Sequence, residues 1–176
     1  MDIPYVGLDT HQETIHAAVL LPGAEKAVED SFANTPEAIR RWARRLRKQA
    51  PGTVRCCYEA GPLGYGLLRE LKALGLECIV VAPALIPVRP GDRIKTDRRD
   101  ACSLALALRA GQLTGIYIPT EQDESVRDYL RKYESLRGDL RVCKQRVLKF
   151  LLRRGISYDG GDPWTVKQRH WLSALP

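Results

Sequence analysis

The hydrophobic pattern of the first hundred residues changes repeatedly between short β-type runs and amphipathic helical runs. Three β-type runs come first, at residues 5–9, 14–21 and 26–32, and short turns separate them. Turns of this length indicate an antiparallel meander, because a parallel crossover needs a dozen or more residues. The remaining elements alternate: helix 36–49, strand 54–59, helix 63–74, strand 76–81 and helix 97–111.

A capping signal marks the first helix. Asn34 and Thr35 precede Pro36 at the first helical position, and Glu37 places an acid just inside. The order of elements, three antiparallel strands followed by helix, strand, helix, strand and helix, is that of the ribonuclease H-like fold. We therefore expect an α/β domain with a mixed five-stranded sheet and flanking helices.

A long helical pattern runs from Glu121 to about Arg154, without proline. Its apolar residues are spaced close to the heptad seam of a coiled coil, with Arg137 at a polar seam position. The predicted seam consists of Val126, Leu130, Tyr133, Leu140, Cys143, Val147 and Phe150. The helix is strongly basic past its first turn. The pattern fits a coiled-coil dimer, and it also fits a helix packed on its own domain with its charge in solvent.

Composition narrows the partner and the compartment. A net charge of +7 and a pI near 9.3 favour a polyanionic partner. Four of the five cysteines lie in apolar runs or helical patterns and none forms a CxxC pair, so we expect buried, reduced thiols. No run approaches the roughly 20 apolar residues that a membrane span needs, and no secretory leader is recognisable. We expect a cytoplasmic protein with no membrane partner.

The candidate chemistry centres on the stretch Lys95-Thr96-Asp97-Arg98-Arg99-Asp100-Ala101. Asp97 and Asp100 are three residues apart at a helix start, so they project from one face. One aspartate there is usually a cap, because free backbone N–H groups and the helix dipole stabilise its carboxylate. Two aspartates on one face, among several basic residues, also suit a metal site that handles phosphates. Both interpretations stay open for this stretch alone.

Two further acids end strands that the ribonuclease H-like order places side by side. Asp9 ends the first strand and Glu59 the fourth, so both would meet the aspartates at one edge of the sheet. Clustered carboxylates repel each other, and divalent ions relieve the repulsion. Hard oxygen ligands suit Mg²⁺ or Mn²⁺, and a pair of ions would assist a phosphodiester displacement.

The acids also have simpler explanations. Asp9 alone fits a strand end that bonds turn amides, whereas Glu59 is harder to explain, since an unpaired buried acid is costly. His11 and His16 are nearby but have no partner at metal-ligand spacing, which favours solvated or packing roles.

Taken together, these motifs resemble one family. Gly7-Leu8-Asp9 before a hairpin, Tyr58-Glu59-Ala60-Gly61 with Tyr65, and the Lys95–Ala101 block resemble the DEDD transposases of the insertion-sequence one-ten family, over roughly residues 4–155. The resemblance implies a RuvC-like nuclease domain. Its catalytic, metal-binding tetrad would be Asp9, Glu59, Asp97 and Asp100, with Mg²⁺ or Mn²⁺ as the cofactor.

The resemblance also implies an organisation and a set of partners. Residues 1–118 would form the catalytic domain, 119–155 a helix for oligomerisation and nucleic-acid contact, and 156–176 a linker and the start of a further domain. In the family that further domain carries a serine thought to attack DNA, and nothing here matches it, so this catalytic half is not expected to recombine DNA alone. The implied partners are donor and target DNA, a structured bridge RNA that guides the enzyme, and other copies through helix 121–154. The implied setting is the nucleoid of a prokaryotic cytoplasm.

The basic residues nearest these elements are the candidates for nucleic-acid contact. They are Arg89, Arg93, Lys95, Arg98, Arg99, Arg141, Lys144, Lys149 and Arg153. Phosphate contact by such residues is independent of sequence, so we expect the choice of DNA site to come from a guide.

Two alternatives belong to other classes of protein. The chain fits a non-catalytic module that binds RNA and dimerises, with incidental acids. A sugar-kinase or actin-like ATPase also starts with a Gly-x-Asp strand and a hairpin, but this sequence lacks the glycine-rich phosphate loop and the duplicated domain of those folds. We favour the metal-dependent transposase.

Overall fold

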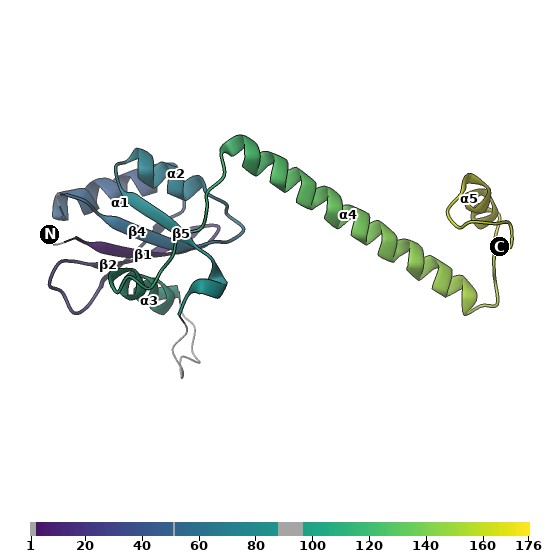
Figure 1. The fold of residues 1–176 in the computed structure, drawn as a ribbon, viewed down its shortest axis with the longest axis horizontal. Helices are drawn as coiled ribbons and strands as arrows, with labels where there is room; N and C mark the ends of the chain where they lie inside the picture. The colour runs from purple at the N-terminus through teal and green to yellow at the C-terminus, as the bar shows by residue number, and fades with distance from the viewer. Residues whose placement is uncertain (1–2, 51, 88–96) are drawn as a thin grey trace. The chain divides into compact units, whose positions relative to one another are not determined.

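The computed structural model describes residues 3–50, 52–87 and 97–176, with the backbone alone for Asp97 and Arg98. The chain divides into two compact units, Met1–Ile118 and Pro119–Pro176. Figure 1 shows a sheet with helices on both faces in the first unit, and a long and a short helix in the second.

The first unit is built on a five-stranded mixed sheet in the order β3-β2-β1-β4-β5. β1 (Tyr5–Thr10), β2 (Thr14–Leu20) and β3 (Val28–Ala33) form an antiparallel meander. β4 (Arg55–Glu59) pairs with β1 in parallel, and β5 (Glu77–Val81) pairs with β4 in parallel. The predicted α/β class, with a mixed five-stranded sheet and flanking helices, is confirmed.

Three helices flank this sheet. α1 (Pro36–Gln49) and α2 (Gly66–Ala73) cover one face, and α3 (Asp97–Arg109) covers the other (Figure 1). A short 3₁₀ turn, η1 (Pro83–Leu85), follows β5. α2 begins three residues later than the predicted start, because Gly64 adopts a left-handed φ of 65° within the preceding turn.

α1 begins where the capping signal predicts. The Thr35 side chain accepts a hydrogen bond from the Ala38 N–H, and Pro36 occupies the first helical turn. Its buried face carries Ile39, Trp42, Ala43 and Leu46, which pack on the sheet. Trp42 stacks on Phe32 of β3 with ring centroids 5.0 Å apart. This packing holds α1 on the face of β1 that carries Val6 and Leu8.

α3 approaches the opposite face of β1 unusually closely at Gly7. A Cβ atom added to Gly7 would lie 2.5 Å from the Ala105 backbone nitrogen and 2.9 Å from the Leu104 Cβ, and it would overlap the Ala101 carbonyl oxygen. The Cys57 thiol of β4 also donates to the Leu104 carbonyl oxygen at 3.6 Å. Glycine is therefore required at position 7 for the helix to seat on the sheet.

The second unit consists of α4 (Glu121–Leu152) and α5 (Val166–Ser173). Leu151 near the end of α4 and Gln168 of α5 are both buried. The Gln168 side chain accepts a hydrogen bond from the Trp164 backbone N–H, and the Lys144 ammonium lies 5.5 Å from the centre of the Trp164 ring. These contacts fold α5 back on the last turns of α4. No described helix is long and apolar enough to cross a membrane.

Most apolar side chains of α4 are exposed, from 40% for Val147 to 71% for Tyr129, whereas Leu148 is half-buried and Leu151 is buried. Tyr129 and Leu136, absent from the predicted seam, complete a row in which apolar residues recur every three or four positions without a break. The complete row is Val126, Tyr129, Tyr133, Leu136, Leu140, Cys143, Val147 and Phe150. Arg137 and Leu130 lie beside this row. The row is therefore apolar throughout, and Arg137 does not occupy a seam position as predicted.

The cysteines are less uniformly buried than the sequence suggests. Cys56, Cys57 and Cys78 are buried in the sheet, Cys102 is half-buried and Cys143 is exposed. Burial raises the pKa of all three sheet thiols, that of Cys78 to about 12. The sheet thiols are thus neutral and protected, whereas the helical pattern around Cys143 does not bury it.

Replacing Gly7 with alanine should destabilise the first unit by at least about 2 kcal/mol, because the new methyl group has no space against α3. Urea unfolding monitored by circular dichroism measures this. Gly66→Ala is the control, since nothing lies within 4 Å of a Cβ there and alanine favours the helix. Equal midpoints for the two variants would contradict the close approach.

In a Cys102→Ser/Cys143→Ser variant, the native chain should show no thiol reactive toward Ellman's reagent at pH 8, because the three remaining thiols are buried and un-ionised. All three should react after unfolding in guanidinium chloride. Rapid reaction of a native thiol would show that the sheet opens readily.

Candidate active site

The carboxyl ends of β1 and β4 bring two of the predicted acids to one edge of the sheet. β1 and β4 are parallel neighbours, and their register pairs Leu8 with Tyr58. Asp9 and Glu59 are the next residues of the two strands, so each acid directly follows the last paired position. Both acids lie on the α3 face, because alternate residues of a strand share a face and Gly7 and Cys57 contact α3.

α3 directs its first turn toward this same edge. At its far end, Arg109 donates to the Ala24 carbonyl oxygen at 2.9 Å, in the turn after β2 and therefore near the start of β1. Ala101 lies over Gly7 in the middle of the strand. Asp97 is one turn before Ala101, about 6 Å along the helix axis. That displacement leads toward Asp9, which follows Gly7 by about 7 Å along the strand.

The Asp9 carboxylate is held by a histidine that the sequence interpretation treats as solvated or packed. The His11 Nε2–H donates to Asp9 Oδ2 at 3.2 Å, and the exposed fractions of the two side chains are 49% and 22%. Asn34 Nδ2 donates to the His11 carbonyl oxygen at 2.8 Å. The His16 ring lies edge-on to the His11 ring, with the ring centroids 6.3 Å apart. His16 is the residue of β2 that pairs with Asp9. The Asp-x-His spacing at the hairpin is the feature of the sequence that could have predicted this hydrogen bond.

The other predicted acids are more open. Glu59 is exposed, so the cost of a buried unpaired acid does not apply to it, while Asp100 is half-buried. Asp100 lies one turn before Leu104, on the side of α3 that contacts β4. The Asp97 side chain lies outside the described residues, as do Arg89, Arg93, Lys95 and the Arg98 side chain.

The carboxylate ligands at this edge are of the type that a hard cation prefers, but the described side chains do not form a complete coordination shell. Carboxylate oxygens are the ligands that Mg²⁺ and Mn²⁺ prefer. Among the described side chains, no group of three or more histidine, cysteine or acidic residues is compact enough to hold a metal ion. The arrangement therefore gathers three acid-bearing segments at one edge, and any ion bound there needs Asp97 or an outside ligand to complete its shell.

The predicted basic contacts fall into two groups. Arg99 is exposed at the head of α3. On the second unit, Arg141, Lys149 and Arg153 are exposed, and Lys144 is half-buried beside Trp164.

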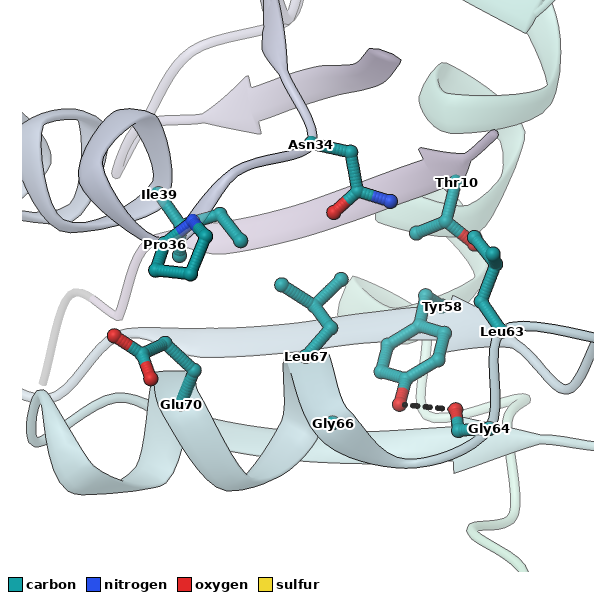
Figure 2. A pocket seen from close by; sticks show the side chains of 10 residues that line it. All are labelled: Thr10, Asn34, Pro36, Ile39, Tyr58, Leu63, Gly64, Gly66, Leu67 and Glu70. Atoms are coloured by element: carbon teal, nitrogen blue, oxygen red, sulfur yellow. Dashed lines mark hydrogen bonds between the residues drawn. The ribbon is translucent and has the colours of Figure 1, made fainter. Parts of the chain in front are cut away.

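A pocket of about 320 Å³ opens on the α1 and α2 face, beside this edge (Figure 2). Thr10 and Tyr58, the strand neighbours of Asp9 and Glu59, contribute to its wall. The Tyr58 hydroxyl donates to the Gly64 carbonyl oxygen at 3.3 Å, and burial raises the tyrosine pKa. Tyr58 is thus a core residue, and the pocket is separated from the acids by the sheet.

Comparison with known proteins decides the family. Residues 6–154 match the DEDD transposase family of IS110 elements, described as "Transposase". The chain belongs to the IS110 family of DEDD transposases. It is 43% identical over 171 residues to a putative transposase, y4qE, of Sinorhizobium fredii, covering 96% of this chain and 43% of that protein. It is also 43% identical over 175 residues to the transposase for insertion sequence element IS1533 of Leptospira borgpetersenii, covering 97% of this chain and 50% of that protein.

The family resemblance read from the motifs is therefore confirmed. The IS110-type chain spans half or less of the length of these curated relatives. The edge formed by β1, β4 and α3 is where the acid-bearing segments of its motifs lie.

Proposed function

We propose that this chain is the catalytic half of a transposase that cleaves and transfers DNA strands at the edge carrying Asp9, Glu59, Asp97 and Asp100. The observation that carries the proposal is the parallel pairing of β1 with β4 beneath α3. This pairing gathers acids that are far apart in the sequence. The transposase names of the relatives support the same reaction class.

Each acid has a distinct part in this proposal. Asp9 offers Oδ1 to a cation while His11 holds Oδ2. Glu59 is exposed and so can turn toward the same cation, and α3 carries Asp97 and Asp100. A divalent ion bound among them would stabilise the charge that develops on the phosphodiester. His11 and Asn34 keep the hairpin and the Asp9 carboxylate in place.

We further propose that a structured bridge RNA guides the choice of donor and target DNA in the nucleoid, and that copies of the chain associate through α4. The exposed apolar row on α4 supports association, because exposed apolar rows of this length usually have a partner. The basic residues of the second half of α4 support contact with a polyanion.

Calorimetric titration with Mn²⁺ tests the site. Binding to the chain, alone or with a short DNA hairpin that supplies phosphate ligands, should weaken at least tenfold in Glu59→Ala and in Asp97→Ala, because each removes a carboxylate ligand. The matched control is Glu77→Gln, an exposed carboxylate paired with Arg55 at the opposite edge of the sheet.

Equal Mn²⁺ affinity in all four chains would refute the site. Retained RNA binding in such acid variants, together with a lack of metal binding in the parent chain, would instead favour the non-catalytic RNA-binding module.

Sedimentation should detect association through α4. The Leu136→Asp variant should be monomeric where the parent chain is at least dimeric, because a carboxylate in the apolar row is costly to bury. Val142→Asp is the control, since Val142 is also exposed, at 46%, but lies on the far side of the helix from Leu140. A monomeric parent chain, or equal dissociation of both variants, would rule out this interface.

A further inference from the structure

α1 carries a concentration of positive charge that the proposed site does not use. Its fourteen residues include six Lys and Arg and one acid, Glu37. The six are Arg40, Arg41, Arg44, Arg45, Arg47 and Lys48. The helix lies on the opposite face of the sheet from α3 and the acids (Figure 1).

Three of these cations hold the fold together. Arg40 Nε donates to Glu70 Oε1 of α2 at 2.7 Å, and Arg45 pairs with Asp30 of β3. Arg47 Nη1 donates to the Leu74 carbonyl oxygen at the end of α2 at 3.2 Å. These three residues lie on the flanks of α1, where their side chains can reach α2 and β3.

The other three cations have no such role. Arg41, Arg44 and Lys48 are exposed, and no hydrogen bond or ion pair to another described residue engages their side chains. Spacings of three and four residues set them in one row, on the side of α1 directly opposite the buried face. Glu37 precedes the row by one turn, at the helix start where an acid is favourable.

The row has the dimensions of a nucleic-acid backbone contact. From Arg41 to Lys48 the helix rises about 10 Å, which matches about three successive phosphates of one DNA strand. Arg44 and Arg47 also line a hollow of about 350 Å³ between α1 and the end of α2, with space for a phosphate group. A row of free cations beside such a hollow suits phosphates better than an acidic peptide, which would need apolar contacts as well.

The course of α1 connects this row to the proposed catalytic edge. Asn34, just before α1, bonds the His11 carbonyl oxygen beside Asp9. α1 starts there and runs away from the edge, placing Arg41 about 8 Å and Lys48 about 18 Å along its axis. A duplex with one phosphodiester at the acids can therefore follow α1 along the outside of the domain.

We propose that Arg41, Arg44 and Lys48 bind the phosphates of uncleaved duplex DNA that flanks the cleavage site. The proposal rests on the proposed function for the identity of the nucleic acid, while the contact itself needs no metal. The row holds and orients the duplex, and it carries no base specificity.

Fluorescence anisotropy with a labelled DNA duplex of about twenty base pairs, in EDTA, tests the contact on the whole 176-residue chain. The Arg41→Gln/Arg44→Gln/Lys48→Gln variant should bind on the order of tenfold more weakly, and the slope of log K against log salt should fall by about 2.7, from three phosphate contacts. Glu37→Gln should tighten binding, since it removes the acid from the row. The thermal midpoint should be unchanged, because the three side chains are exposed.

The control is Arg40→Gln/Arg45→Gln, which removes two charges from the flanks of the same helix, outside the row and the hollow. A change of less than threefold in the control, against the full loss in the row variant, supports a local contact. Equal losses in both, or no loss in either, overturn it, as does a loss confined to a duplex RNA of the same sequence. The Glu59→Ala chain should bind the duplex normally in EDTA, so failure of the catalytic proposal and failure of this one are separable.

Discussion

The arrangement of the first unit depends on the close approach of α3 to β1 at Gly7. A helix normally packs on a sheet through a layer of side chains, but here the helix backbone itself occupies the space where a Cβ atom would lie. Ala18 on β2 and Ala101 and Ala105 on α3 are also small and buried, so the contact extends over two strands. Leu104 then fills the space over β4 and Val81 and fixes the rotation of the helix.

The proposed site follows from that seating. Because α3 cannot slide or roll without clashing with β1, its first turn is held toward the sheet edge where β1 and β4 end. Asp9 and Glu59 reach the edge through the parallel pairing of their strands. The hydrogen bond from His11 to Asp9, and the support of Asn34, show that the hairpin after β1 is also organised around this edge. Backbone geometry thus brings acid-bearing segments of three elements to one edge.

The two faces of the sheet divide the remaining charge. The α3 face ends in acids, whereas the α1 face presents cations, half of them engaged in ion pairs and hydrogen bonds that join α1 to its neighbours. In the second unit, α4 exposes an unbroken apolar row along most of its length, and Leu151 near its end is buried.

The sequence by itself determined the order and type of the elements, because strand alternation, the Thr35 cap and the turn glycines are local signals. It also marked Asp9, Glu59, Asp97 and Asp100 through motifs specific enough to identify the family. The predicted start of α2 was three residues too early, because the left-handed backbone conformation of Gly64 cannot be read from the residue type alone. Tertiary structure alone decided that Glu59 is exposed, that Cys143 lies in an open row, and which cations of α1 are free. Each of these depends on residues far apart in the chain meeting or failing to meet, and no local pattern encodes such distances.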